Sequence, residues 1–396
     1  MNITYLNPHA DDFCAAPISF KLAKRRALKK YGYLLNEPIK RGQSVDVLID
    51  GTLSSLIPHN IFDCLPKLLR FFILRIEIYY WLKLNNFENK IKIHYSPESI
   101  TDKSVLYMFS YKNCTGSFAK RIAGIESFNL KIINLSHYMI RTREKGQNCA
   151  KLTNVVFTSE ADVSNHRFFI RFFGSNRDVI ALPFMVEERF KLIKILSGRE
   201  KKCATTGSFH ALEYERPREF YKDFRSYFGL DYYHPLRKAI YDSQDRLEEY
   251  FISKISPYRE AGRLGRFFKF LQKFDLSQKK YFSFNIVDFY NSCIFANIGE
   301  EAHGLPAVGA FEAMACGCIL IGEEAYYKNI GMVAGKHYLT HDGHLEDVLD
   351  VVKNNRDNIK KLNNISNGAI DYVENNCRAV VLYDKFMSKV SSKLEG

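Results

Sequence analysis

The sequence lacks the cysteine spacing of a disulfide-stapled or metal-binding domain. Its nine cysteines form no CxxC pair and no disulfide framework, which is typical of proteins in a reducing compartment. The amino-terminal stretch "MNITYLNPHADDF" has neither the charged region nor the apolar region of a signal peptide. We therefore expect a cytoplasmic protein whose thiols are reduced and mostly buried.

Long uninterrupted apolar runs are also missing. The most apolar long segment, residues 65–84, contains five charged residues, so it does not supply the roughly 20 apolar residues that a membrane span needs. One interpretation is a buried helix of the first domain, which we favour. The alternative is a helix that rests on a membrane with its aromatic and basic side chains.

Several binding motifs are absent as well. The lack of zinc-finger spacing, of an RNP-like aromatic pattern and of a basic tail weighs against a nucleic-acid-binding protein. No GxGxxG follows the first predicted strand, which weighs against a dehydrogenase. The formal net charge is nevertheless +13. Such an excess predicts an acidic partner, whether nucleic acid, an anionic membrane or a phosphorylated substrate.

The pattern of apolar runs predicts an α/β protein with two Rossmann-like domains. Short β-rich runs alternate with helical or polar segments, as in a mainly parallel sheet. In the first half these runs are residues 3–7, 45–49, 91–95, 104–110, 131–136, 154–158 and 178–182. A second series begins at Cys203, and residues 234–255 have helical periodicity.

We place the break between the domains near residues 186–200. This gives a first domain over residues 1–190 and a second over residues 191–375. Residues 376–396 are predicted to form a terminal helix that packs back on the first domain.

The most informative stretch is residues 293–327. The apolar run "CIFANI" leads through Gly299 into a loop that contains Gly304, Leu305 and Pro306, and "AFEAMACG" then begins a helix before the strand "CILIG". Such a βαβ unit places a helix N-terminus at the carboxyl edge of a parallel sheet, where phosphate binds.

Three carboxylates accompany this predicted phosphate site. We expect Glu312 in the first turn of the helix, where it would accept hydrogen bonds from ribose hydroxyls. Glu300 and Glu301, at the end of the strand, are candidates for binding sugar hydroxyls. The combination predicts a sugar nucleotide as the ligand.

The string "EEAHGLPAVGAFEAMACGCILIG" resembles the donor-site signature of GT-B fold glycosyltransferases of the group 1, or family 4, type. The resemblance implies two domains facing a cleft, the first binding the acceptor and the second the nucleoside diphosphate sugar. The family usually has seven residues between its two glutamates, whereas Glu301 and Glu312 enclose ten. The ribose role carries over to Glu312, while the role of Glu301 and the choice between retention and inversion stay open.

Further donor-site candidates precede this signature in the second domain. Gly207 and Ser208 would bring backbone amides to the diphosphate, or form an ordinary strand-to-helix turn. Basic side chains would stabilise the departing phosphate, or only solvate helix faces; the candidates are Arg237, Arg259, Arg263 and Arg266.

Candidates for a general base lie in the first domain. His9, Asp11 and Asp12 follow the first strand, where an inverting enzyme would place its base; capping of a helix by either aspartate is the alternative. His137 also ends a strand, with a structural role as its alternative.

Together these features predict a glycosyltransferase that moves a sugar from a nucleotide-sugar donor to a saccharide or lipid-linked acceptor. The context we expect is the synthesis of bacterial lipopolysaccharide, O-antigen or capsule at the inner face of a membrane, with possible peripheral contact through anionic lipid. No DxD motif ends a strand, so we predict no metal and no cofactor. The alternative is a non-catalytic protein that binds nucleotide sugars or nucleic acid.

Overall fold

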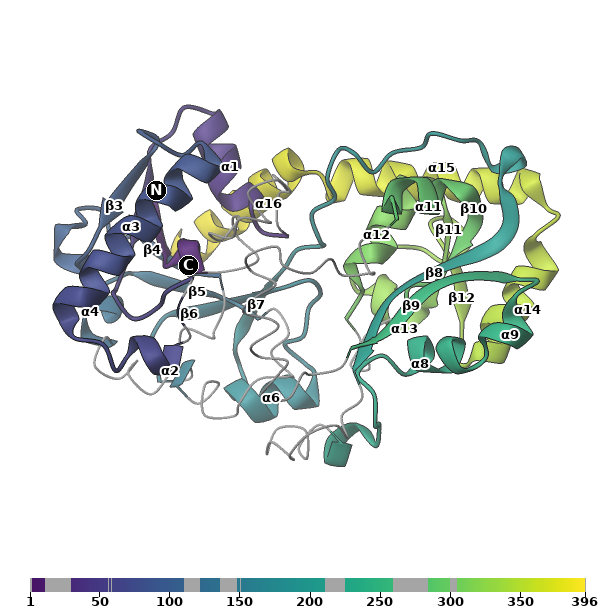
Figure 1. Cartoon of the computed structure of the whole chain (residues 1–396), viewed down its shortest axis with the longest axis horizontal. Helices are drawn as coiled ribbons and strands as arrows, with labels where there is room; N and C mark the ends of the chain where they lie inside the picture. Colours follow the sequence, from purple (N-terminus) through teal and green to yellow (C-terminus); the bar gives the residue numbers. More distant parts are fainter. Residues whose placement is uncertain are drawn as a thin grey trace. The chain divides into compact units, whose positions relative to one another are not determined.

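A computed structural model gives the structure of the chain, and its described parts form two compact units (Figure 1). The described residues are 2–10, 30–55, 57, 59–109, 122–135, 148–149, 151–210, 225–258, 284–299 and 305–395. Those of the first unit lie within Met1–Leu182 and Leu382–Gly396, and those of the second within Pro183–Phe268 and Ser277–Val381.

The first unit is built on a seven-stranded sheet in the order β3-β2-β1-β4-β5-β6-β7, and every neighbouring pair is parallel. All residues of β1, β4, β5 and β6 are buried, as expected for strands covered on both faces. The strands are β1 Ile3–Leu6, β2 Val45–Leu48, β3 Ile91–His94, β4 Val105–Met108, β5 Leu130–Asn134, β6 Val155–Ser159 and β7 Asp178–Ala181.

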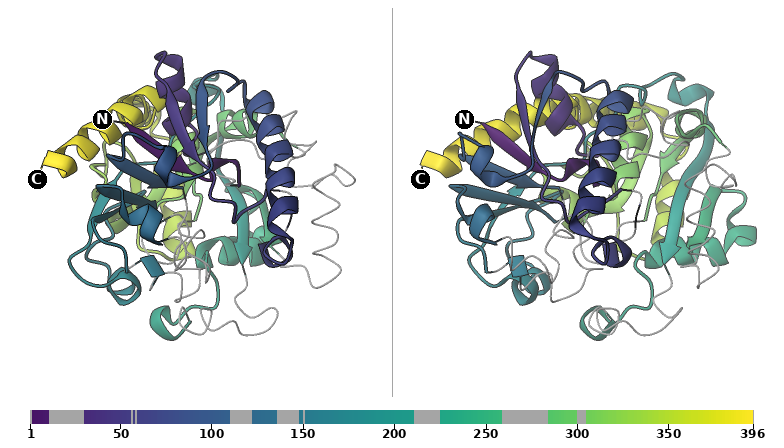
Figure 2. Two further views of the ribbon diagram at one scale, coloured as in Figure 1. Left: turned by 90° about the vertical axis from the view of Figure 1, so that its left-hand side faces the viewer. Right: turned by 60° about the vertical axis from the view of Figure 1, so that its left-hand side comes forward.

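Helices lie on both sides of this sheet. On one face, the hydroxyl of Tyr5 donates to the carbonyl of Leu34 in α1, and the ring of Tyr107, which pairs with Tyr5 across the sheet, packs on Phe386 of α16. In the left view of Figure 2 the strands lie between α16 and α3. The helices are η1 Pro8–Ala10, α1 Tyr33–Lys40, α2 His59–Phe62, α3 Lys67–Asn85, η2 Pro97–Ser99, α4 Ile122–Glu126, α6 Arg167–Phe173 and α16 Ala379–Glu395.

Helix α3 corresponds to the apolar segment at residues 65–84. It buries Leu74, Glu77, Ile78 and Trp81 along one side, whereas its opposite side is exposed. The prediction of a buried helix is therefore correct for one face only. Of the described helices, none is long and apolar enough to span a bilayer.

The second unit has a five-stranded parallel sheet in the order β12-β11-β10-β8-β9. Its strands are β8 Glu200–His210, β9 Phe251–Tyr258, β10 Cys293–Ala296, β11 Ile319–Glu323 and β12 Leu339–His341. Two parallel α/β sheets confirm the predicted fold class. The continuous helix expected at 234–255 is wrong, because residues 251–255 pair with β8 as part of β9.

Two apolar clusters cover the faces of the second sheet. One includes buried residues of α11, α12, α13 and α15, and the other includes buried residues of α8, α9, α14 and α15. Figure 1 shows α11 and α15 on one side of the strands and α8 and α9 on the other. The helices are η6 Leu196–Gly198, α8 Pro235–Asp242, α9 Gln244–Leu247, α11 Ile286–Ser292, α12 Val308–Ala315, α13 Glu324–Lys328, α14 Leu345–Asn355 and α15 Ile359–Asn376.

Of the seven cysteines in the described parts of the chain, six are buried. Three of them, Cys293, Cys316 and Cys318, surround the buried guanidinium of Arg199. This guanidinium donates to the carbonyls of Cys316 at 2.7 Å and Cys293 at 3.2 Å, and to the side-chain oxygen of Asn291 at 3.1 Å. Burial raises the pKa of Cys293 to about 11 and that of Cys316 to about 12. These thiols are therefore protonated and structural at neutral pH.

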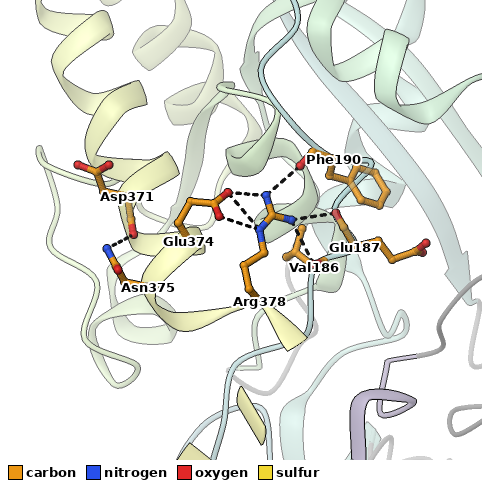
Figure 3. A network of polar contacts seen from close by, with 7 residues as sticks. All are labelled: Val186, Glu187, Phe190, Asp371, Glu374, Asn375 and Arg378. Atoms are coloured by element: carbon orange, nitrogen blue, oxygen red, sulfur yellow. Dashed lines mark hydrogen bonds and ion pairs between the residues drawn. The ribbon is translucent and has the colours of Figure 1, made fainter. Parts of the chain in front are cut away.

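Arg378, at the junction of α15 and α16, fastens the segment that begins the second unit (Figure 3). Its guanidinium donates to the carbonyls of Val186, Glu187 and Phe190 at 3.2, 2.9 and 3.2 Å, and pairs with Glu374 one turn back in α15. The amide of Val186 also donates to the carbonyl of Cys377 at 2.9 Å. The first and last segments of the second unit are thus held side by side.

Candidate functional site

The sequence stretch 293–327 forms β10, α12 and β11 in the second unit. β10 and β11 are parallel neighbours, so the connecting helix runs back with its N-terminus at their carboxyl edge. A Cβ added at Gly309 would lie 3.0 Å from the side chain of Ile298, so the first turn of α12 is packed directly beyond the end of β10. Leu305 and Pro306 are buried in the segment that enters this helix. The helix N-terminus therefore lies at the carboxyl edge of the sheet, as predicted, although the helix begins two residues earlier than expected.

Glu312 lies deeper in the helix than expected. α12 begins at Val308, after an extended Ala307, so Glu312 is its fifth residue and the prediction of a first-turn position is wrong. Because valine and glycine have low helix propensity, Val308 and Gly309 were not expected to belong to the helix. The side chain of Glu312 is half-buried.

Arg237 is the basic residue that the structure places at this edge. It projects from α8 and is only 8% exposed. Its Nη1 donates to the carbonyl oxygen of Ser208 at 2.8 Å, and its Nε donates to that of Ile298 at 2.5 Å. A guanidinium therefore bridges β8 and the segment that follows β10.

Two glycines make room for this guanidinium. A Cβ at Gly207 would lie 2.8 Å from Cζ of Arg237, and one at Gly299 would lie 2.7 Å from its Cγ. Both glycines have positive φ, of +125° and +60°. The predicted donor-site residues Gly207, Ser208 and Arg237 thus meet at one place.

The alternative interpretation of Gly207 and Ser208, a strand-to-helix turn, is wrong. β8 continues through both residues to His210, pairing with β9, whereas β10 pairs with β8 only as far as Ala204. Because β10 is much shorter than β8, one side of the end of β8 is free of strand pairing, and Arg237 occupies this side. Sequence patterns indicate where strands lie, but they do not show how far one strand extends beyond the strand that it pairs with.

Asn297 secures the same edge and was not predicted. Its amide N–H donates to the carbonyl of Ala204 at 3.1 Å, and its side-chain nitrogen donates to that of Ile321 at 2.9 Å. Asn297 therefore links β8, β10 and β11 at the point where the chain leaves the sheet.

In the first unit, His9 follows β1 in the short helix η1 and is 1% exposed. Its Nε2 lies 3.2 Å from the carbonyl oxygen of Leu53, and its Nδ1 has no hydrogen-bond partner among the residues that the structure describes. Donation to a carbonyl requires the proton on Nε2, so Nδ1 carries the lone pair. Burial lowers the pKa of His9, against smaller opposing effects of Glu77 and Asp50. The imidazole is consequently neutral at physiological pH.

Glu77 is a buried carboxylate near His9 that was not singled out as a site residue. It accepts hydrogen bonds from the amide of Ser55 at 3.0 Å and from the hydroxyls of Ser54 and Ser55. These contacts tie α3 to the loop after β2. The available signal was that Glu77 is the only acidic residue in an apolar and basic segment.

A second such carboxylate is Glu160, directly after β6 and 3% exposed. It accepts a short hydrogen bond from Tyr31, and burial together with this carboxylate raises the pKa of the phenol well above its usual value. Asn134, at the end of β5, donates to the hydroxyl of Thr158 at 3.2 Å. Polar side chains therefore gather at the carboxyl ends of β5 and β6, although the strands themselves are largely apolar. The sequence does not show that these two strand ends are neighbours.

Several predicted residues lie outside the described parts of the chain: Asp11, Asp12, His137, Arg259, Arg263, Arg266, Glu300, Glu301 and Gly304. Within the residues that the structure does describe, His, Cys, Asp and Glu side chains form no group of three or more that would hold a metal ion.

No protein-family model matches the sequence, and no curated protein matches it. Solved structures do. HepE of Anabaena, in complex with UDP and glucose, matches with a TM-score of 0.55 and 9% identity over 99% of this chain and 100% of the other. Sucrose-phosphate synthase of Thermosynechococcus elongatus matches with a TM-score of 0.51 and 11% identity over 100% and 99%. At such low identity the likeness establishes the GT-B glycosyltransferase fold.

Proposed function

We propose that this protein is a glycosyltransferase that uses a nucleotide sugar, with the donor bound at the carboxyl edge of the second sheet. The observation that carries the proposal is the bridging of β8 and the end of β10 by Arg237, beside the N-terminus of α12. A buried guanidinium and the free amides of a helix N-terminus are complementary to a diphosphate. The UDP and glucose in the HepE structure agree with this ligand class.

In this proposal the protein contributes electrostatics rather than covalent chemistry. As the bond to the anomeric carbon breaks, negative charge develops on the leaving phosphate, and Arg237 with the amides of α12 would stabilise it. Glu312 would accept hydrogen bonds from the ribose hydroxyls. We expect no metal to be required, so activity should withstand EDTA.

The acceptor would bind at the first sheet. There, the neutral imidazole of His9 has the Nδ1 lone pair that a general base needs, and Asp11, Asp12 and His137 are further candidates. A saccharide or lipid-linked acceptor of lipopolysaccharide, O-antigen or capsule synthesis suits a basic protein. Stereochemistry depends on whether one of these groups acts as a base.

Isothermal titration calorimetry against a panel of sugar nucleotides tests the donor assignment. We expect one or more to bind, and Glu312→Ala to weaken binding about tenfold through loss of charge-assisted hydrogen bonds. Glu324→Ala, which removes an exposed acid from neighbouring α13, is the matched control and should bind normally.

Unchanged affinity in Glu312→Ala, or no binding of any sugar nucleotide, would disprove the assignment. Binding without hydrolysis or transfer of the sugar would instead favour a non-catalytic nucleotide-sugar protein.

A further inference from the structure

The outward face of α3 carries an unusual density of exposed apolar side chains. Leu68 is 83% exposed, Phe72 61% and Tyr79 55%. On the same face, between 40% and 50% exposed, are Leu69, Phe71, Ile76 and Tyr80. At 100° per residue these seven side chains fall within one half of the helix circumference, opposite the buried Leu74, Glu77, Ile78 and Trp81. We call these seven residues the α3 face.

The α3 face continues beyond the helix. The ring of Tyr95, at the end of β3, lies 5.4 Å from that of Phe71 with an edge-on geometry, and it is 40% exposed. Contiguous apolar surface of this kind on a folded protein marks a binding surface.

The charge of the helix identifies the partner. Of its four basic residues, Arg75 and Lys83 lie on the α3 face, whereas Lys67 and Arg70 lie toward the buried side, where Arg70 pairs with Asp63. The single carboxylate of the helix, Glu77, is fully buried on that opposite side. The guanidinium of Arg75 lies over the ring of Phe71 at 5.0 Å, and the ammonium of Lys83 over the ring of Tyr79 at 5.8 Å. Cations are therefore interleaved with the apolar and aromatic groups of the α3 face, with no carboxylate of the helix among them.

We propose that the α3 face docks on an anionic lipid bilayer, with the helix lying in the plane of the interface. Leucine, isoleucine and phenylalanine would enter the boundary between headgroups and acyl chains, while tyrosine, arginine and lysine would remain at headgroup level. A second copy of this chain fits less well, because a two-fold interface sets the same patch against itself and would oppose like charges. The proposal is independent of donor binding, and it would bring the first sheet close to a lipid-linked acceptor.

Flotation of the full-length protein with vesicles tests this surface. We expect binding to phosphatidylglycerol mixed with phosphatidylcholine, little binding to phosphatidylcholine alone, and release by high salt. The double variant Leu68→Ser with Phe72→Ser should weaken binding at least about tenfold. Arg75→Glu with Lys83→Glu should weaken it about fivefold or more per position.

Matched control variants test whether vesicle binding depends on the α3 face or only on the net charge and exposed apolar surface of the whole protein. Lys328→Glu with Lys336→Glu makes the same change in charge on exposed sites of the second unit, and Val333→Ser removes an apolar side chain that is 54% exposed. Both should bind vesicles normally, and no variant should change sugar-nucleotide affinity.

Three results would overturn the proposal: no binding to anionic vesicles, equal losses in the control variants, or a dimer in light scattering that Leu68→Ser with Phe72→Ser dissociates. Calorimetry with sugar nucleotides remains a separate readout, so failure here would leave the proposed function unaffected.

Discussion

The side chain of Arg237 can lie where it does because Gly207 and Gly299 have no Cβ atom. The backbone at Gly207 and Gly299 has positive φ, and the space that a Cβ would fill at each is taken by Arg237. The sequence suggests for Gly207 a backbone amide that approaches a diphosphate. In the structure both glycines make room for the guanidinium of Arg237.

We predict that Gly207→Ala destabilises the second unit by about 2–4 kcal/mol, because backbone strain adds to a clash with Arg237. Gly331→Ala is the matched control: its φ is +84°, but nothing lies within 4 Å of the added Cβ, so it should cost only about 1–2 kcal/mol. Amide hydrogen exchange of β8 and β10 measures the difference. Equal effects of the two substitutions would show that Arg237 moves aside.

The break between α15 and α16 matters at the scale of elements. Both helices are long, yet Cys377 and Arg378 separate them and are bonded to residues 186–190. Figure 3 shows the guanidinium enclosed by carbonyls and by Glu374. The segment has no regular structure of its own here, so these bonds satisfy backbone groups that no sheet or helix satisfies.

Arg378→Met is predicted to destabilise the second unit by about 2–3 kcal/mol, because three carbonyls and Glu374 lose a charged donor. It should also speed limited proteolysis within residues 183–190. Arg246→Met breaks only an exposed ion pair with Glu346 and should cost less than about 1 kcal/mol. If the two variants were equally stable, the Arg378 contacts would be incidental.

At the scale of the whole molecule, each unit buries a histidine whose pKa is lowered. Desolvation is the main cause for His9 in the first unit and for His337 in the second, where Lys336 adds to it. Below the unfolded value of 6.5, the unfolded chain binds protons that the folded chain does not. Stability is therefore complete above pH 6.5 and is lost as pH falls toward the folded pKa values.

We predict that the unfolding free energy falls between pH 6.5 and 5 by up to about 1.4 kcal/mol per pH unit for each histidine. His9→Gln keeps a donor for Leu53 and should flatten this dependence in the first unit, reported by fluorescence of the single tryptophan, Trp81. His337→Asn keeps an acceptor for the amide of Val333 and should flatten it in the second unit, followed by hydrogen exchange. A double variant with the original slope would refute this account.

The sequence alone determined the class of the fold and the place of the helix that connects β10 and β11. Strands that are buried on both faces, such as β1 and β4, appear in the sequence as short and mostly apolar runs. The less buried β3 and β7 are also recognisable as short β-rich runs, and glycine and proline mark the loop before α12. Such features depend on neighbours along the chain.

Only the tertiary structure decided what meets at each sheet edge. The end of β8 beyond β10, the convergence of Gly207, Gly299 and Arg237, and the burial of Glu77 beside His9 all join residues distant in sequence. The same holds for α3, whose sequence favours a buried helix although one of its faces is exposed. Which of its faces is covered depends on packing, because burial is a property of neighbours in space.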